Sequence, residues 1–400
     1  MNAQSPASTS PRTVVWIGLV ALAVAMGIGR FSFTPLMPLM MRDGSLEGAT
    51  GAVWAAANYI GYLAGALSAS WFGKQPRRGL QLGLAGVAAS TLGMAVLAAA
   101  PPWVGGLLRG IAGVCSAWVL VCASSWCLPE LARRQASPLG GWIYTGVGVG
   151  IALTGSLAWL GGTQSAQTLW IELGLLAVAG TAYVRHARTD QASCPSALRS
   201  GTSSQTQKPP LSERSPIGLI VCYGAFGYGY IVPATFLPTM ARQLVDDPLV
   251  FGLTWPLFGL AAAVSVALAA RWLADWPRRR VWALAQSVMA TGTLIPLLQQ
   301  SLWALAVSAV LVGGTFMVAT MAGLQLAREQ RPSNPTPLLA RMTGAFAAGQ
   351  IAGPLLIRLM GGADLSQSEA LSWANGIATL VLLSTAAWLW RDNSPRQHSA

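Results

Sequence analysis

The chain contains two related halves, and this internal repeat constrains its fold more than any other feature of the sequence. Residues 27–40, GIGRFSFTPLMPLM, resemble residues 227–240, GYGYIVPATFLPTM, with Gly, Pro and Met at matching places. Residues 71–78 resemble residues 272–279 in the same way. The order and direction of the matches are preserved, so the repeat is parallel. An apolar chain built from two such repeats is the usual construction of a secondary transporter, with the solute site between the halves.

The composition indicates that both halves lie in a membrane. Apolar residues make up 53% of the 400 residues and charged residues only 10%, whereas about 25% of the residues in soluble domains are charged. Twelve apolar runs approach the roughly 20 residues that a helix needs to cross a bilayer. We therefore expect an all-α integral membrane protein with six helices in each half. The expected spans are 14–37, 50–72, 79–100, 103–127, 137–160, 167–185, 216–240, 249–272, 281–298, 302–327, 337–361 and 368–390.

The basic residues predict which way the helices run. The net charge is +12, and all but five of the 25 Lys and Arg residues fall in segments on one side of the expected arrangement. The exceptions are Arg42, Arg242 and Arg358 on the other side and Arg30 and Arg109 within spans. By the positive-inside rule the basic side is cytoplasmic. We expect both termini in the cytoplasm, and this sorting by side argues against nucleic-acid binding.

A polar segment at the middle of the chain separates the halves. Residues 187–215 are rich in Ser, Thr, Gln and Pro and contain no apolar run, as expected for a linker. The first apolar run continues to Met41 and contains the repeat, so we expect an uncleaved first helix. The expected parts are a cytoplasmic tail (1–13), an N-terminal six-helix bundle (14–186), the cytoplasmic linker (187–215), a C-terminal six-helix bundle (216–391) and a tail (392–400).

Several motifs resemble those of the major facilitator superfamily. ARWLADWPRRR at 270–280 is similar to the family's loop between helices 8 and 9, and GKQPRR at 73–78 is its shorter counterpart between helices 2 and 3, with Lys74 where the family has aspartate. LLRGIAG at 107–113 resembles the helix 4 motif, and GWIYTGVGVGIALTG at 141–155 resembles the glycine-rich helix 5 motif. GIGRFSFTPLMPLM, followed by AANYIGYLAGAL at 56–67, resembles the YbfB/YjiJ-type subgroup.

This resemblance implies a twelve-helix carrier of the bacterial inner membrane, made of two parallel-repeat six-helix bundles. It also implies that the basic loops gate the cytoplasmic mouth. The candidate gating residues are Asp275, Arg278, Arg279, Lys74, Arg77 and Arg78.

Arg30 is the strongest candidate for contact with a solute. It lies sixteen residues into the first expected span, which at 1.5 Å per residue puts it roughly 24 Å along the helix. A charge at this depth is costly and usually faces a cavity or a partner. The alternative is structural: Arg30 binds carbonyls freed by Pro35 and Pro38, or pairs with Asp43 or Glu47.

Arg109 lies at a similar depth in the fourth expected span. Its counterpart in the second half is Val312, and that of Arg30 is Tyr230. One wall would then be basic and the other aromatic, which predicts an organic anion as substrate, because a guanidinium can hold a carboxylate through two hydrogen bonds. A structural or proton-relay role for Arg109 is equally open.

Polar and aromatic side chains on neighbouring helices complete the candidate set. Tyr223, Phe226 and Tyr230 fall on one face of the seventh helix, where they could contact a substrate or simply pack. Asn58, Tyr62 and Gln350 lie within spans, where hydrogen bonds between helices explain them as readily as a substrate does. Pro35, Pro38, Pro233 and Pro238 are expected to kink the first and seventh helices.

The sequence thus predicts a secondary active transporter that moves a small solute by alternating access, with proton-linked transport. A facilitator or exchanger without proton coupling, and a receptor or scaffold with a carrier fold, are the alternatives. We expect no metal site, because the five Cys and two His form no ligand pattern. We expect no enzyme and no cofactor, because HExxH, GxSxG and an Asp pair at membrane depth are absent, and no ATP-driven pump, because no GxxxxGK[ST] phosphate loop is present. The expected partners are a small-molecule substrate and the lipid bilayer, and we expect a monomer.

Overall fold

The described residues form twelve long helical units, called rods here because some of them join two or three helical segments. The computed structural model describes residues 10–96, 101–187, 216–242, 248–299, 301–361 and 367–391. Nine of the rods in these ranges are long and apolar enough to cross a membrane, and α3, α4 and α12 complete the set. The N-terminal rods are α1 (Pro11–Leu22) continued by the π-helix η1 (Ala23–Phe31) and α2 (Phe33–Arg42), α3 (Gly48–Ser68) with the 3₁₀ turn η2 (Ala69–Phe72), α4 (Pro76–Met94), α5 (Pro102–Arg133), the 3₁₀ segment η4 (Ser137–Tyr144) with α6 (Thr145–Leu160), and α7 (Ala166–His186). The C-terminal rods are α8 (Ile217–Arg242), α9 (Pro248–Trp272), α10 (Arg278–Leu298), α11 (Leu302–Gln330), α12 (Thr336–Gly361) and α13 (Gln367–Trp390).

The predicted all-α membrane fold is therefore confirmed, and most helix ends fall within a few residues of the predicted ones. The ninth and tenth spans were separated in the sequence only by residues 299–301, and α10 indeed ends at Leu298 while α11 begins at Leu302. The linker and most of both predicted tails lie outside the described residues, so the predicted division of the chain remains a prediction.

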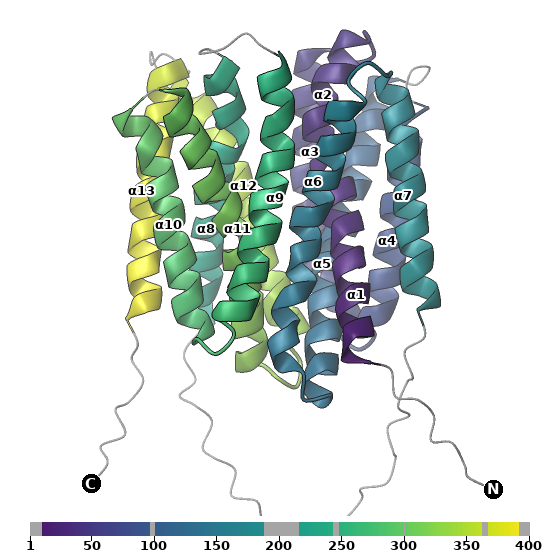
Figure 1. Cartoon of the computed structure of the whole chain (residues 1–400), viewed down its shortest axis with the longest axis vertical. Helices are drawn as coiled ribbons and strands as arrows, with labels where there is room; N and C mark the ends of the chain where they lie inside the picture. Colours follow the sequence, from purple (N-terminus) through teal and green to yellow (C-terminus); the bar gives the residue numbers. More distant parts are fainter. Residues whose placement is uncertain are drawn as a thin grey trace, which may run out of the picture.

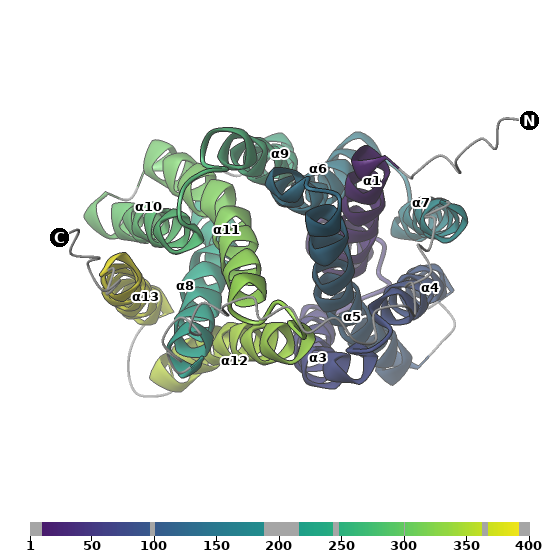
Figure 2. The same ribbon diagram turned by 90° about the horizontal axis from the view of Figure 1, so that it is seen from below.

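The two halves lie side by side (Figures 1 and 2). Seen along the helices, α6 packs against α9 on one flank of the interface, and α3 packs against α12 on the other. Glycine allows the α6–α9 contact to be close. A Cβ atom on Gly148 would lie 2.3 Å from the backbone nitrogen of Ala263, and one on Gly259 would lie 2.2 Å from that of Ala152.

The exterior of the bundle carries tryptophan near both of its ends. α1 begins and α13 ends at the same end of the bundle, called here the terminal end (Figure 1). Trp71, Trp272 and Trp390 are exposed near this end, and Trp103 and Trp303 are exposed near the opposite end. Because tryptophan concentrates at the two membrane–water interfaces, this distribution supports a bundle that spans the bilayer.

The helix type near the prolines that are predicted to kink the chain differs between the two halves. In the first rod the regular α-helix gives way to the π-helix η1, directly before the segment that contains Pro35 and Pro38. By contrast, α8 remains α-helical across Pro233 and Pro238. The first rod and α8 thus differ in helix type, and kinks at these prolines remain a prediction. The proline positions alone could not reveal this difference.

Candidate functional site

Arg30 lies where the two halves meet. It is the penultimate residue of η1, and only 2% of its surface is exposed. Its Nη2 donates a hydrogen bond to Oε1 of Gln350 in α12, across the interface between the halves. The guanidinium carbon lies 3.6 Å from the ring centre of Tyr62 and 5.6 Å from that of Tyr59, both in α3. A buried cation is thus held by one neutral acceptor and by aromatic rings.

The buried polar atoms that lack a partner around Arg30 are all able to donate hydrogen bonds. They are Nε and Nη1 of Arg30, Nε2 of Gln350, the hydroxyl of Tyr62 and, from α9, Nε1 of Trp255. Trp255 belongs to this group through Phe31, whose ring centre lies 6.5 Å from that of Trp255. An unsatisfied buried donor costs about 1–3 kcal/mol. The site therefore has an excess of donors over acceptors.

The neighbourhood of Arg30 also lacks negative charge. Within the described residues no Asp or Glu side chain forms an ion pair with Arg30. Asp43, one partner considered from the sequence, pairs instead with Arg42 at 2.7 Å. The uncompensated cation and the excess of donors together suit a ligand rich in acceptors, above all an anion.

Arg109 serves the backbone of the first rod. Its Nη1 donates to the carbonyl of Gly29 and its Nη2 to the carbonyl of Arg30, each at 3.0 Å. The side chain is 3% exposed, and its guanidinium carbon lies 4.9 Å from the ring centre of Phe33. Of the two alternatives open in the sequence, this geometry corresponds to the structural one.

Asn58 also makes a contact between helices. Its Nδ2 donates to the carbonyl of Arg109 at 2.9 Å and so ties α3 to α5. Tyr62 is in the same helix, and its ring covers Arg30 while its hydroxyl has no partner. Asn58 therefore links α3 to α5, whereas Tyr62 and Gln350 border Arg30.

The aromatic face of α8 packs against α12 and α11 of the same half. Tyr223, Phe226 and Tyr230 are all buried, and all three rings lie against Phe346 of α12, with centre distances between 5.0 and 6.2 Å. Tyr230 also stacks on Phe316 of α11 at 4.8 Å. Phe316 contacts Phe31 of the other half at 6.3 Å. A continuous row of rings therefore leads from α8 to the residue beside Arg30.

The basic residues predicted to gate the terminal end bind helix ends within their own half. Arg279 donates from Nε to the carbonyl of Leu389, at 2.9 Å, and from Nη2 to that of Trp388. In the N-terminal half, Nη2 of Arg77 donates to the carbonyl of Ala187 at 3.2 Å. The third helix of each half thereby caps the sixth. These hydrogen bonds satisfy carbonyls at the helix end that have no amide partner within the helix.

The remaining predicted gating residues are less connected. Arg278 donates to the carbonyl of Ala274 at 2.6 Å and lies 3.8 Å from Glu329. Asp275, Lys74 and Arg78 form no ion pair with the described part of the chain. The gating role of this group remains a prediction.

Three polar residues that the sequence analysis did not single out take part in the arrangement. Ser116 donates to the carbonyl of Ala25 at 2.8 Å; it lies seven residues after Arg109, on the same helix face, and this spacing was an available signal. Ser125 bonds Thr336 of the other half at 3.0 Å. Glu130 is buried near the end of α5 and accepts from Arg133 and Arg134.

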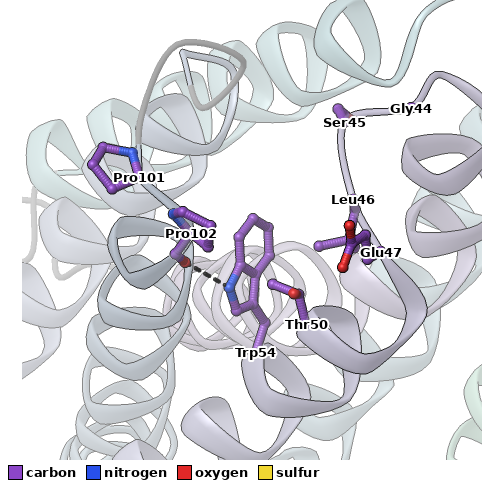
Figure 3. Close-up of a pocket in the computed structure, with 8 residues that line it drawn as sticks. All are labelled: Gly44, Ser45, Leu46, Glu47, Thr50, Trp54, Pro101 and Pro102. Carbon is purple, nitrogen blue, oxygen red and sulfur yellow. Dashed lines mark hydrogen bonds between the residues drawn. The ribbon is translucent and has the colours of Figure 1, made fainter.

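A surface pocket lies apart from Arg30, at the end of the N-terminal half opposite the termini (Figure 3). Trp54 forms part of one wall and donates from Nε1 to the carbonyl of Pro102 at 2.9 Å. Glu47, at the start of α3, lies on another side of the pocket. The lining residues are Gly44, Ser45, Leu46, Glu47, Thr50, Trp54, Pro101 and Pro102.

Comparison with known proteins identifies relatives that are transporters. A chloramphenicol efflux pump of Mycobacterium tuberculosis is 26% identical over 193 residues, which are 47% of this chain and 44% of the pump. A class D tetracycline resistance protein of Salmonella ordonez is 28% identical over 146 residues, 36% of each chain. This chain therefore spans less than half the length of the curated relatives that it matches.

The same fold occurs in a solved structure. The crystal structure of the human organic anion transporter MFSD10 (TETRAN) superposes with a TM-score of 0.69 over 96% of this chain and 100% of that one, at 15% sequence identity. At this identity the likeness concerns the fold alone. The sequence profile of the family described as "Uncharacterised MFS-type transporter YbfB" matches residues 22–387. The chain thus belongs to the YbfB-like family of major facilitator superfamily transporters, which are not enzymes.

Proposed function

We propose that the protein is a secondary transporter that binds a small organic anion between its two halves and carries it across the bacterial inner membrane. The observation that carries the proposal is Arg30, a buried cation at the interface that has no carboxylate partner among the described residues. The unpartnered donors of Gln350, Tyr62 and Trp255 add hydrogen bonds for an acceptor-rich ligand. The row of rings that begins at Phe31 would pack against its apolar part.

Movement of the solute requires the halves to separate at one end and then at the other. The contacts across the interface include several near the terminal end: Ser125 bonds Thr336, and η4 packs against α9 and α11. With the termini in the cytoplasm, as the basic residues predict, these contacts support a state closed on the cytoplasmic side. Alternating access would break them as the opposite end closes.

The energy source is part of the proposal, and the carboxylates restrict it. Glu130 is the one buried carboxylate residue in the described part of the chain, and two arginines neutralise it. No buried acid is therefore left beside Arg30 to carry a proton. We infer that a proton coupled to transport travels on the substrate anion itself or on an acid away from Arg30, such as the exposed Glu47 or the half-buried Glu172.

A binding assay tests the substrate class. Thermal unfolding of the purified protein would be followed with pairs of a carboxylate and its amide, such as benzoate and benzamide, in wild type, Arg30→Gln and Arg271→Gln. Arg271 is an exposed arginine at the end of α9 and serves as the matched control. We expect carboxylates alone to stabilise wild type and the control, by about 2.7 kcal/mol at 100 times the dissociation constant. Equal stabilisation by the amides, or retention in Arg30→Gln, would exclude the anion site.

A transport assay tests coupling with the carboxylate that stabilises the protein. In proteoliposomes, accumulation against its gradient under an imposed pH difference supports proton-linked transport. Equilibration that is the same with and without the pH difference indicates a facilitator or exchanger. Binding without flux would favour a receptor or scaffold.

The export of uncharged or zwitterionic antibiotics is a second candidate, because two relatives carry the names of antibiotic efflux and resistance proteins. The same assays distinguish it. Chloramphenicol, which is uncharged, would stabilise wild type and Arg30→Gln equally, because an uncharged solute does not need the guanidinium.

A further inference from the structure

At the junction between η1 and α2, three carbonyls accept hydrogen bonds from side chains. The carbonyl of Ile28 accepts from the hydroxyl of Ser32, and those of Gly29 and Arg30 accept from the two terminal nitrogens of Arg109. Three consecutive carbonyls in the middle of a membrane helix therefore receive a hydrogen bond from outside the backbone ladder. A backbone carbonyl without a partner is costly in the bilayer, so side-chain donors stabilise a helix where its backbone ladder is interrupted.

Pro35 explains why a donor is needed at this place. In the π register a carbonyl accepts from the amide five residues later, and five residues after Arg30 is Pro35, which has no N–H group. Regular α-helix resumes at Phe33, with the amide of Leu36 bonded to the carbonyl of Ser32. The change of register thus lies between Arg30 and Leu36, where the backbone lacks one donor.

Arg109 is held firmly in the position from which it supplies donors. It is 3% exposed, and its own carbonyl accepts from Asn58 of α3 at 2.9 Å. Both of its terminal nitrogens are engaged, and Nε is the atom of its guanidinium that remains without a partner. The carbonyls of Gly29 and Arg30 thus hold both terminal nitrogens against the backbone of the first rod.

We propose that Arg109 is a positioning residue that fixes the π-helical register of η1 and thereby aims Arg30 at the interface between the halves. The guanidinium replaces the amide that Pro35 lacks, through two parallel hydrogen bonds in a fork that lysine cannot reproduce. Arg109 binds the carbonyl of Arg30 itself, so this bond lies next to the Cα atom from which the Arg30 side chain extends. The register of this turn therefore sets the direction of the Arg30 side chain. The positioning role does not depend on which substrate Arg30 binds.

Hydrogen exchange of the purified full-length protein tests the proposal without any substrate. Arg109→Met removes the donors and keeps a long side chain, so we expect at least tenfold faster amide exchange in peptides covering 23–34. Asn58→Ala is the matched control, because it removes a bond to the backbone of Arg109 and leaves the guanidinium in place. It should accelerate exchange at the α3–α5 contact and leave 23–34 unchanged. If Arg109→Met yields no purified protein, Arg109→Lys is measured instead and should show an intermediate increase.

A rescue variant separates positioning from general packing. Adding Pro35→Ala to Arg109→Met restores a backbone N–H at the required place, and we expect exchange in 23–34 to return most of the way to the wild-type rate. Pro38→Ala in the same background restores an N–H one turn further on and should not rescue. Wild-type exchange in Arg109→Met, or equal rescue by both alanines, would overturn the proposal. Failure of the anion assay would leave this result unaffected, so the two proposals fail separately.

Discussion

The first rod of the N-terminal half and its repeat partner α8 start from the same glycine spacing and differ at one turn. Both cross the fifth helix of their half closely: a Cβ atom on Gly27 would lie 2.4 Å from the Cα of Gly150, and one on Gly227 would lie 2.3 Å from the carbonyl oxygen of Phe346. Three residues after these glycines one half has Arg30 in a π-helix and the other has Tyr230 in an α-helix. The packing has been kept in both copies, whereas the residues facing the interface differ.

The contrast between Arg30 and Tyr230 shows how a duplicated fold can contain an asymmetric site. Arg30 needs the π register, a donor from Arg109 and an aromatic cover from Tyr62. At the positions of the two arginines the C-terminal half has Tyr230 and Val312, both buried, and it needs none of these supports. One half supplies charge and the other supplies aromatic surface. A solute that bridges the halves would thus meet different chemistry on each side.

The largest expected effect of breaking this asymmetry is on binding. Arg30→Gln should weaken binding of a stabilising carboxylate by roughly 30-fold or more, since loss of a buried charged partner costs about 2–5 kcal/mol. Tyr230→Phe, at the equivalent place in the other half, should change affinity less than threefold, because its ring is retained. Titration calorimetry with the carboxylate measures both variants. A larger loss in Tyr230→Phe would reverse the assignment of the two walls.

The shared architecture should respond alike in both halves. Gly27→Val and Gly227→Val each place a side chain against backbone, and we expect each to destabilise the protein by about 1–3 kcal/mol. Thermal unfolding in detergent measures the loss. Gly44 is unsuitable as a control, because its φ of 70° strains any side chain. The control is Gly106→Ala, because the nearest atom to its Cβ would be 3.6 Å away. Unequal losses at Gly27 and Gly227 would show that the two crossings are not equivalent.

The sequence was sufficient to predict the fold because the signals that determine it are long and repeated. Apolar runs, the repeat and the basic loops each extend over many residues, and they agree on twelve helices. The site was predictable only in part. The depth of Arg30 and the face shared by Tyr223, Phe226 and Tyr230 follow from helical spacing. That Arg109 binds carbonyls rather than solute depends on the register of another helix, which the proline pattern does not reveal.

A smaller effect is expected from the arginines that cap the sixth helix of each half. Arg77→Gln should free the carbonyl of Ala187, and Arg279→Gln those of Trp388 and Leu389. We expect each to lower stability by about 1 kcal/mol, the usual size of a partly buried contact with a helix C-terminus. Equal shifts in thermal unfolding would support a symmetric, structural role. Loss of transport in proteoliposomes without loss of stability would instead support the gating role predicted from the sequence.

The smallest expected effect is the pH dependence that Asp43 adds to the N-terminal half. Its carboxylate accepts from the backbone amide of Ala166, at the start of α7, at 2.6 Å, and this bond, together with Arg42, lowers the pKa of Asp43 below its usual value. A lowered pKa in the folded state means that the stabilisation is present above the unfolded pKa, near 4, and is lost as the pH falls through the folded value. Asp43→Asn keeps an acceptor and removes the charge, so it should cost only about 0.5 kcal/mol at pH 7.

That cost should vanish as the pH is lowered below the folded pKa, where the wild-type carboxyl is also neutral. Thermal unfolding of wild type and Asp43→Asn between pH 7 and pH 3 measures the difference. A residue that holds its proton so weakly is a poor proton carrier near neutral pH, so Asp43→Asn should also leave any pH-driven accumulation intact. Loss of that accumulation in a stable Asp43→Asn protein would make Asp43 the coupling site. Proton coupling would then depend on this carboxylate, at the end of the bundle opposite the termini, and not on a proton carried by the solute.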